Sequence, residues 1–238
     1  MKGHNKLIVA LDFESKHKAL QAVDHLGSDV RLFKVGLELF SSSGPEIVAE
    51  IKRKGCGVFL DLKFHDIPNT VEKAARAVSG LGAFIFNVHA LGGLEMMKRA
   101  KGAAGDKSKV IAVTILTSTD ENALKKCGIN VNIDDEVMKL AVLAKEAGLD
   151  GVVASAKEAA RIRKELGKDF LIVVPGIRPA VFTPGQEPAS AAQDDQKRVA
   201  TPLEAISAGA DYIVVGRPIT AAPDPLKAAR DIIKELGQ

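Results

Sequence analysis

The sequence has few cysteines and no long apolar run, and each shortage excludes a class of protein. Only two cysteines, Cys56 and Cys127, occur in 238 residues. Two are too few for a disulfide framework, and these two do not have the spacing of metal ligands. No apolar run approaches the roughly 18 residues that cross a bilayer. We therefore expect a cytoplasmic protein with ordinary thiols and no membrane partner.

A strong net charge is also missing. Lysine and arginine number 33 and aspartate and glutamate 30, which gives a formal charge of +3. The basic residues are scattered among acidic ones, so we expect no nucleic-acid partner. The aspartates and histidines form no triplet at metal-ligand spacing, so we expect no metal site. With 46% hydrophobic residues, the chain can fill one core, and we expect a single domain over residues 1–238.

Short β-branched runs alternate along the chain with amphipathic stretches, as expected when each parallel strand is followed by a helix. We predict strands at residues 7–11, 32–36, 58–62, 84–88, 110–115, 151–154, 171–174 and 212–215. Helices are predicted between them, among others at residues 16–26, 45–54, 71–81, 134–147 and 225–236. An open doubly wound sheet has the same local pattern, but the strand count favours a single-domain (β/α)8 TIM barrel.

Polar residues gather where the predicted strands end. They are Asp12, Lys34, Asp61, Lys63, His89, Thr117, Ser118, Arg178, Gly216 and Arg217. In a TIM barrel the carboxyl ends of the strands form the catalytic face, where side chains from several strands meet one ligand. Two long connections at this face, residues 117–133 and 178–201, are candidate lids.

The segment DLKFHDIPNT is the most informative, because it places two carboxylates around a lysine directly after an apolar strand. Side chains alternate along a strand, so Asp61 and Lys63 should point the same way, with Asp66 just beyond. Charges packed this closely shift one another's pKa and suit proton transfer or electrostatic catalysis. The alternative is a surface salt bridge, which contributes little.

This segment resembles the DxKxxDIxxT signature of the orotidine 5'-monophosphate decarboxylase family. Further resembling segments follow in the family's order and span nearly the whole chain: VALD at 9–12, FKVG at 33–36, ILTS at 115–118, PGIR at 175–178 and VGRP at 215–218. The resemblance implies conversion of orotidine 5'-monophosphate to UMP and carbon dioxide, the last step of de novo UMP synthesis, without a cofactor. It also implies a homodimer.

The resemblance assigns roles residue by residue. Lys34, Asp61, Lys63 and Asp66 would be catalytic, with Asp66 contributed by the partner subunit and Lys63 donating a proton to C6 of the pyrimidine. Asp12 and Thr70 would bind the ribose hydroxyls, Ile67 would belong to the substrate site, and Thr117 and Ser118 would lie near the pyrimidine edge.

At the phosphate end, Gly216 and Arg217 suit an anion on chemical grounds, because glycine admits backbone N–H groups and a guanidinium binds phosphate oxygens bidentately. The strand 7 loop with Arg178 would help, and the resemblance adds Gln196. That loop is longer than is usual in the family, so Gln186 is a rival for the role of Gln196.

Several alternatives stay open at this stage. Lys34 alone would suit a lysine with a packed stem and a solvated ammonium, and the Thr117 and Ser118 hydroxyls would suit ordinary caps or turns. His89 we interpret as a satisfied structural donor, and His65 as facing away from the charged residues or shaping the loop. The rival functions are a magnesium-dependent relative, such as a 3-keto-gulonate 6-phosphate decarboxylase or a hexulose phosphate synthase, and a silent phosphate-binding scaffold.

Overall fold

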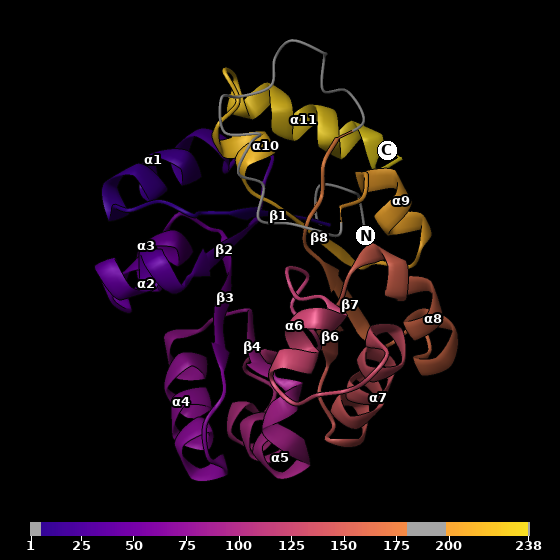
Figure 1. The fold of residues 1–238 in the computed structure, drawn as a ribbon. Helices are drawn as coiled ribbons and strands as arrows, with labels where there is room; N and C mark the ends of the chain where they lie inside the picture. The colour runs from indigo at the N-terminus through magenta and orange to yellow at the C-terminus, as the bar shows by residue number, and fades with distance from the viewer. Residues whose placement is uncertain (1–5, 180–198, 238) are drawn as a thin grey trace.

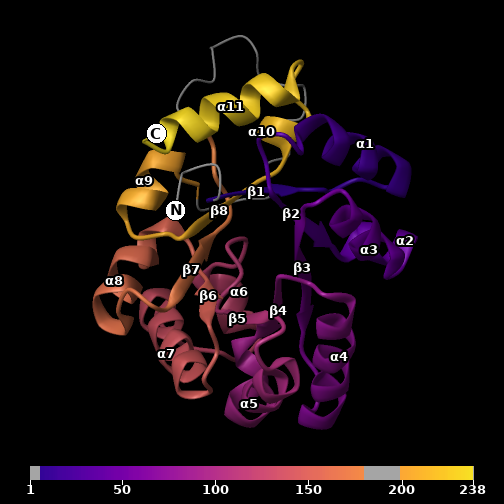
Figure 2. The same cartoon turned by 180° about the vertical axis from the view of Figure 1, so that it is seen from behind.

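In the computed structural model, which describes residues 6–179 and 199–237, the strands form a closed parallel barrel in the order β1 to β8, and β8 pairs with β1. The helices surround the strands (Figures 1 and 2). The strands are β1 (Leu7–Ala10), β2 (Leu32–Gly36), β3 (Gly57–Phe64), β4 (Ile85–His89), β5 (Lys109–Val113), β6 (Gly151–Val153), β7 (Leu171–Val174) and β8 (Tyr212–Val215). The predicted TIM barrel is confirmed, and most strand bounds differ from the predicted ones by at most two residues.

Helices connect successive strands around the outside. They are α1 (Lys16–Leu26), α2 (Leu37–Ser43), α3 (Glu46–Arg53), α4 (Pro68–Leu81), the 3-10 helix η2 (Ala90–Gly92), α5 (Gly93–Ala104), α6 (Glu121–Lys126), α7 (Ile133–Glu146), α8 (Ala156–Leu166), α9 (Pro202–Ser207), α10 (Arg217–Thr220) and α11 (Pro225–Glu235). None of the helices in the described residues combines the length and the apolar character that a membrane crossing needs.

Local signals explain where several helices begin. Ser15 caps α1 by accepting a hydrogen bond from the Lys18 N–H, and Pro68 occupies the first turn of α4, where a missing N–H costs little. The connection 117–133 was expected to be a long loop. It contains α6, because the Asp120 carboxylate caps a helix by accepting from the Ala123 N–H at 2.9 Å.

The core has two layers. One fills the barrel interior and includes Ile8, Leu32, Phe59, Ile85 and Tyr212; the other packs the outward faces of the strands against the helices. Because strand side chains alternate, residues two positions after an inward-facing core residue also face the barrel axis. The alternation places polar side chains at the open end of the barrel axis. Each lies two positions after a core residue: Asp12 after Ala10, Lys34 after Leu32, Asp61 after Phe59 and Asn87 after Ile85.

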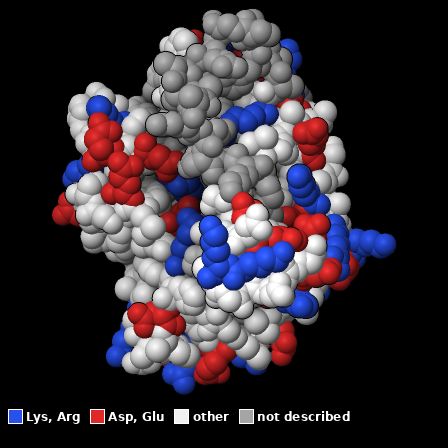
Figure 3. Space-filling model, in the orientation of Figure 1, with Lys and Arg blue, Asp and Glu red and all other residues white. Residues whose placement is uncertain are grey.

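The surface carries both signs of charge. On the face shown in Figure 3, basic and acidic side chains are interspersed over the helices. Among the described residues, several oppositely charged side chains form exposed pairs within one helix, such as Glu95 with Arg99 and Lys227 with Asp231. Such exposed pairs add little stability, because water screens both charges.

Candidate active site

A cavity of about 750 Å³ opens at the carboxyl ends of the strands. Its size is within the usual range for small-molecule sites. The polar residues that line it are Asp12, Lys34, Asp61, Lys63, Asn87, Thr117, Ser118, Arg178 and Arg217, together with Gly176 and Gly216. Every strand-end residue named from the sequence therefore lines this cavity, apart from His89.

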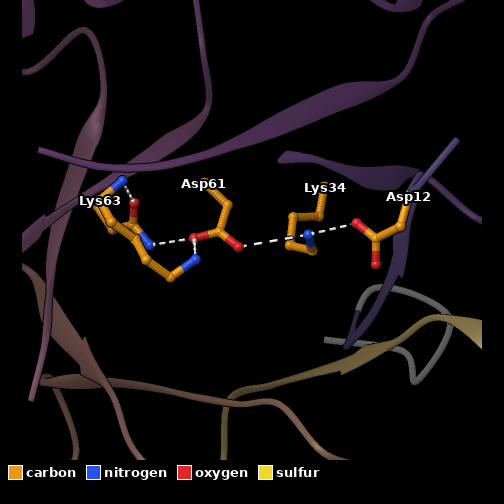
Figure 4. Close-up of polar contacts among 5 residues, drawn as sticks. Asp12, Lys34, Asp61 and Lys63 are labelled. Atoms are coloured by element: carbon orange, nitrogen blue, oxygen red, sulfur yellow. Dashed lines mark hydrogen bonds and ion pairs between the residues drawn. The ribbon is translucent and has the colours of Figure 1, made fainter. Parts of the chain in front are cut away.

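Four charged side chains form a row of alternating sign in the cavity (Figure 4). The Lys63 ammonium donates to Asp61 Oδ1 at 2.6 Å, and Asp61 Oδ2 lies 3.4 Å from Lys34 Nζ. Lys34 in turn donates to Asp12 Oδ1 at 2.9 Å. The side chains of Lys34 and Asp61 are each 12% exposed, so the middle of the row is nearly out of solvent. The sequence placed Asp61 and Lys63 together, and the structure confirms that they meet.

Burial and ion pairing shift the pKa values of Lys34 and Asp61, the two inner residues of the row, in opposite directions. Burial alone would lower the pKa of Lys34, but the carboxylates of Asp61 and Asp12 outweigh it and the pKa is raised. Burial alone would raise the pKa of Asp61, but Lys34 and Lys63 outweigh it and the pKa is lowered. Both residues are therefore charged at neutral pH, because each buried charge has an opposite charge beside it.

The Lys63 backbone departs from strand geometry. Its φ is +52°, and it is the one non-glycine residue with positive φ in residues 6–179 and 199–237. The pairing of β3 with β4 shifts between Leu60 and Phe64, so Lys63 lies inside an irregularity. Regular strand alternation therefore does not extend to Lys63. Its side chain reaches Asp61 through a bulge in β3.

Sequence reasoning missed Asn87. This β4 residue is 1% exposed, donates from Nδ2 to Asp61 Oδ1 at 2.7 Å and accepts the Lys63 N–H at 2.8 Å. A signal was present: Asn87 is a polar residue two positions after Ile85, in a strand that is otherwise apolar up to His89.

Asp66 and Ile67 lie on the connection from β3 into α4, and Thr70 lies in the first turn of α4. In the described part of the chain, none of the three lines the cavity of its own barrel. All three are exposed, Ile67 by 66%, and Asp66 Oδ1 accepts the Ile67 N–H at 2.6 Å. Asp66 therefore does not join the charged row within one chain.

Thr117 and Ser118 sit in the turn that follows β5, where the Thr119 N–H donates to the Leu116 carbonyl at 2.9 Å. Both line the cavity. Because the cap of α6 is Asp120, neither hydroxyl provides the side-chain cap of that helix.

Gly216 and Arg217 lie where β8 passes into α10, and both line the cavity. Arg178 lines it from the end of β7, where its N–H donates to the Ala200 carbonyl at 2.9 Å. Gln196 and its rival Gln186 lie outside the described residues.

His89 differs from the expectation of a satisfied donor. Its Nδ1 is buried without a hydrogen-bond partner in the described residues, and its ring centroid lies 5.5 Å from that of the exposed His65. Burial, followed by the neighbouring His65 and Lys63, lowers the pKa of His89. The expectation that His65 shapes the loop stays a prediction.

The fold and the cavity together define a (β/α)8-barrel enzyme whose catalytic face holds a row of alternating charges. Comparison with known proteins identifies the family of this enzyme. Residues 5–232 match the model of the Orotidine 5'-phosphate decarboxylase / HUMPS family. The chain belongs to this family.

Relatives of the same name are similar over nearly the whole chain. An orotidine 5'-phosphate decarboxylase of Geotalea uraniireducens is 51% identical, over 97% of this chain and 95% of the relative. One of Nitrosococcus oceani is 48% identical, over 98% and 97%. The crystal structure of orotidine 5'-phosphate decarboxylase from Lactobacillus acidophilus matches with a TM-score of 0.85 and 38% identity, over 98% of this chain and all of that one.

Proposed function

We propose that this chain is a carboxy-lyase that converts orotidine 5'-monophosphate to UMP and carbon dioxide in pyrimidine biosynthesis, as one domain spanning residues 1–238 and without a cofactor. The family supports the reaction. The observation that carries the proposal is the row Asp12–Lys34–Asp61–Lys63 at the cavity wall, in which every contact joins opposite charges. Removing charges from water costs stability, and ion pairing often recovers only part of that cost. A fold that keeps such a row in spite of the cost favours a catalytic use for it.

The chemical difficulty lies at C6 of the pyrimidine. When the bond to the carboxylate breaks, carbon dioxide leaves and the electron pair stays on C6, in an orbital that does not overlap the ring π-system. Stabilisation must therefore be electrostatic. Lys63 is the cation for this task, and one of its ammonium protons then moves to C6, which gives UMP and a neutral amine that solvent reprotonates.

Asp61 and Lys34 prepare Lys63 for this step. The Asp61 carboxylate is fixed by Lys63 on one oxygen and faces Lys34 with the other. A substrate carboxylate placed beside Asp61 is disfavoured relative to the transition state, in which that negative charge has moved to C6 beside Lys63. Lys34 keeps the Asp61 charge in place and holds the pair together.

The remaining residues predicted for the site bind the rest of the nucleotide. Arg217, the Gly216 turn and Arg178 hold the phosphate, and Gln196 or its rival Gln186, both outside the described residues, closes over it. Asp12 and Thr70 bind the ribose hydroxyls, while Thr117 and Ser118 recognise the pyrimidine edge. Phosphate contacts made far from C6 supply binding energy for alignment of the reacting end.

A homodimer completes the site. Asp66 and Ile67 on the β3–α4 connection and Thr70 in the first turn of α4 are exposed, and in the described residues they do not line the cavity of their own chain. In the dimer this connection reaches the partner's cavity, where Asp66 extends the charged row beyond Lys63 and Ile67 and Thr70 contact the substrate. The alternating order of charges supports this arrangement, because the Lys63 end of the row is positive.

The test is the absorbance change of orotidine 5'-monophosphate on addition of the purified protein, with and without a chelator. We expect full activity in both. Activity that the chelator abolishes and magnesium restores would favour the magnesium-dependent relatives, to be assayed with their own sugar phosphates. Inactivity of the folded protein toward every one of these substrates would leave only the scaffold alternative.

A further inference from the structure

We propose that Asn87 is a positioning residue for this reaction: its side-chain amide holds the Lys63 backbone and the Asp61 carboxylate, and so aims the Lys63 ammonium. The inference rests on the proposed function of Lys63. Asn87 belongs to β4, outside the segment that carries the charged residues 61, 63 and 66. It contacts the reacting groups only through the two residues that it holds.

The contacts fix which way the Asn87 amide points. A backbone N–H can only donate, so the side-chain oxygen must face Lys63 N, at 2.8 Å. An ionised carboxylate can only accept, so the NH2 group must face Asp61 Oδ1, at 2.7 Å. The same Asp61 oxygen accepts from Lys63 Nζ at 2.6 Å. Asn87 thus holds both the main chain of Lys63 and the carboxylate that its ammonium contacts.

The strand irregularity explains why such a holder is needed. Leu60 pairs with Phe86, and pairing resumes with Phe64 opposite Val88. Residues 61–63 of β3 therefore lie opposite the single β4 residue Asn87. Within this bulge the Lys63 N–H donates to the side-chain oxygen of Asn87. A left-handed backbone is unfavourable for a residue with a side chain, so Lys63 keeps φ +52° only while neighbouring contacts hold it.

The purely structural alternative is that Asn87 only fills a buried place in β4. Two observations favour positioning. Both polar ends of the amide contact the charged row, and Asn87 itself lines the cavity. A core role predicts a loss of stability alone, whereas positioning predicts a loss of turnover with binding retained.

Asn87→Ala is the first test. We expect kcat to fall by about ten- to a hundredfold, because misplacement of a reacting group by about 1 Å has effects of this size. The dissociation constant of UMP should stay within about threefold, since product binding does not need the Lys63 proton at C6. A kcat within about twofold of wild type, or a loss confined to UMP binding, would overturn the proposal.

Ser108→Ala is the matched control. Ser108 is 4% exposed and its hydroxyl donates to the Ala83 carbonyl at 2.6 Å, just before β5 begins, at the opposite end of the barrel. The variant loses a buried hydrogen bond of the same kind away from the charged row. Its stability should fall while kcat changes by less than about twofold, as expected of a site outside the reaction. An equal loss of kcat in the control would mean that the effect of Asn87→Ala reflects general damage to the core, and this would overturn the proposal.

Asn87→Asp keeps the side-chain volume and adds a readout that a packing role would not move. At neutral pH it places a carboxylate against Asp61 Oδ1, so turnover should be lower than in wild type. Once protonated, the new acid can donate to Asp61 and accept from the Lys63 N–H. The ratio of mutant to wild-type kcat should therefore rise as pH falls, and a ratio independent of pH contradicts the proposal.

Folding is checked by circular dichroism and thermal melting. Where Asn87→Ala does not fold, the pH response of Asn87→Asp decides. If neither variant folds at any pH, Asn87 is a core residue and the proposal fails. Activity of the wild-type protein toward orotidine 5'-monophosphate separates the two claims: an inactive wild type overturns the proposed function, while an active wild type with an unimpaired Asn87→Ala overturns only the role of Asn87.

Discussion

At the residue scale, Lys63 is the proposed proton donor. We expect Lys63→Ala to abolish turnover almost completely while leaving UMP binding largely intact, because Lys63 acts after carbon dioxide begins to leave. Steady-state kinetics and UMP titration measure both quantities. A variant that keeps more than about a tenth of wild-type turnover, a barrier change below roughly 1.4 kcal/mol, would exclude Lys63 as the proton donor.

In the proposed site Arg217 binds the phosphate, at the opposite end of the substrate from Lys63. We expect Arg217→Ala to weaken UMP binding by about ten- to a hundredfold, the effect of losing a charge-assisted hydrogen bond worth about 1.5–3 kcal/mol. Uridine, which has no phosphate, should bind both proteins alike. Calorimetry with the two ligands gives the comparison, and an equal loss for nucleoside and nucleotide would remove Arg217 from the phosphate site.

His89 makes stability depend on pH. Its pKa is lowered in the folded protein by burial and by His65 and Lys63, so the unfolded chain binds the proton more readily. The contribution is fully present above the unfolded pKa of about 6.5 and is lost as pH falls through the lower folded value.

The free energy of unfolding should thus fall more steeply on the acid side for wild type than for His89→Gln, which has no proton to bind. Urea denaturation between about pH 5 and 7.5, at one protein concentration, measures this. Parallel curves for the two proteins would show that His89 does not titrate on unfolding.

The residue types of the charged row could be predicted from the sequence, but their exact arrangement could not. Alternation along β3 places Asp61 toward the barrel axis, and the polar strand ends identify the catalytic face. The left-handed backbone of Lys63 depends on a shift in pairing with β4, and pairing between strands far apart in sequence leaves no trace in a local pattern. For the same reason Asn87 was read only as part of a strand.

Helices and strands were predicted best where a regular pattern of buried residues extends over the whole element. The strands β2, β7 and β8 and the helix α1 have the predicted bounds, because buried β-branched runs and helical periodicity both extend over the whole element. The short helix α6 was missed, since its six residues bury little beyond Leu124 and its main signal is the Asp120 cap. The helix α4 begins at Pro68, three residues before the predicted start, because its first turn has exposed residues and no periodic apolar pattern.

At the scale of the whole molecule, the proposed site belongs to a dimer. Mixing two inactive variants, Lys63→Ala and Asp66→Ala, should restore activity. One heterodimer site would carry both lesions and the other site neither. Random exchange of equal amounts makes about half the dimers mixed, so roughly a quarter of all sites should be intact in a twofold-symmetric dimer.

Refolding the mixture and assaying it against each variant alone provides the measurement. Mass spectrometry of the intact complexes supplies the control that subunits have exchanged. A mixture that has exchanged, yet is no more active than its components, would mean that Asp66 serves its own chain or no site.

The two halves of the chain contribute different residues to the cavity. Asp12, Lys34, Asp61, Lys63 and Asn87 come from β1 to β4 or directly after them, whereas Thr117, Ser118, Arg178, Gly216 and Arg217 all follow β5, β7 or β8. In the proposed mechanism the first half of the chain thus supplies the charged row and the ribose contacts, whereas the second half supplies the contacts to the phosphate and the pyrimidine edge. The two halves meet at β4–β5 and where β8 returns to β1. Because both halves line the cavity, we expect a refolding chain to complete it only after β8 has paired with β1, and the proposed dimer to gain activity no earlier than that pairing.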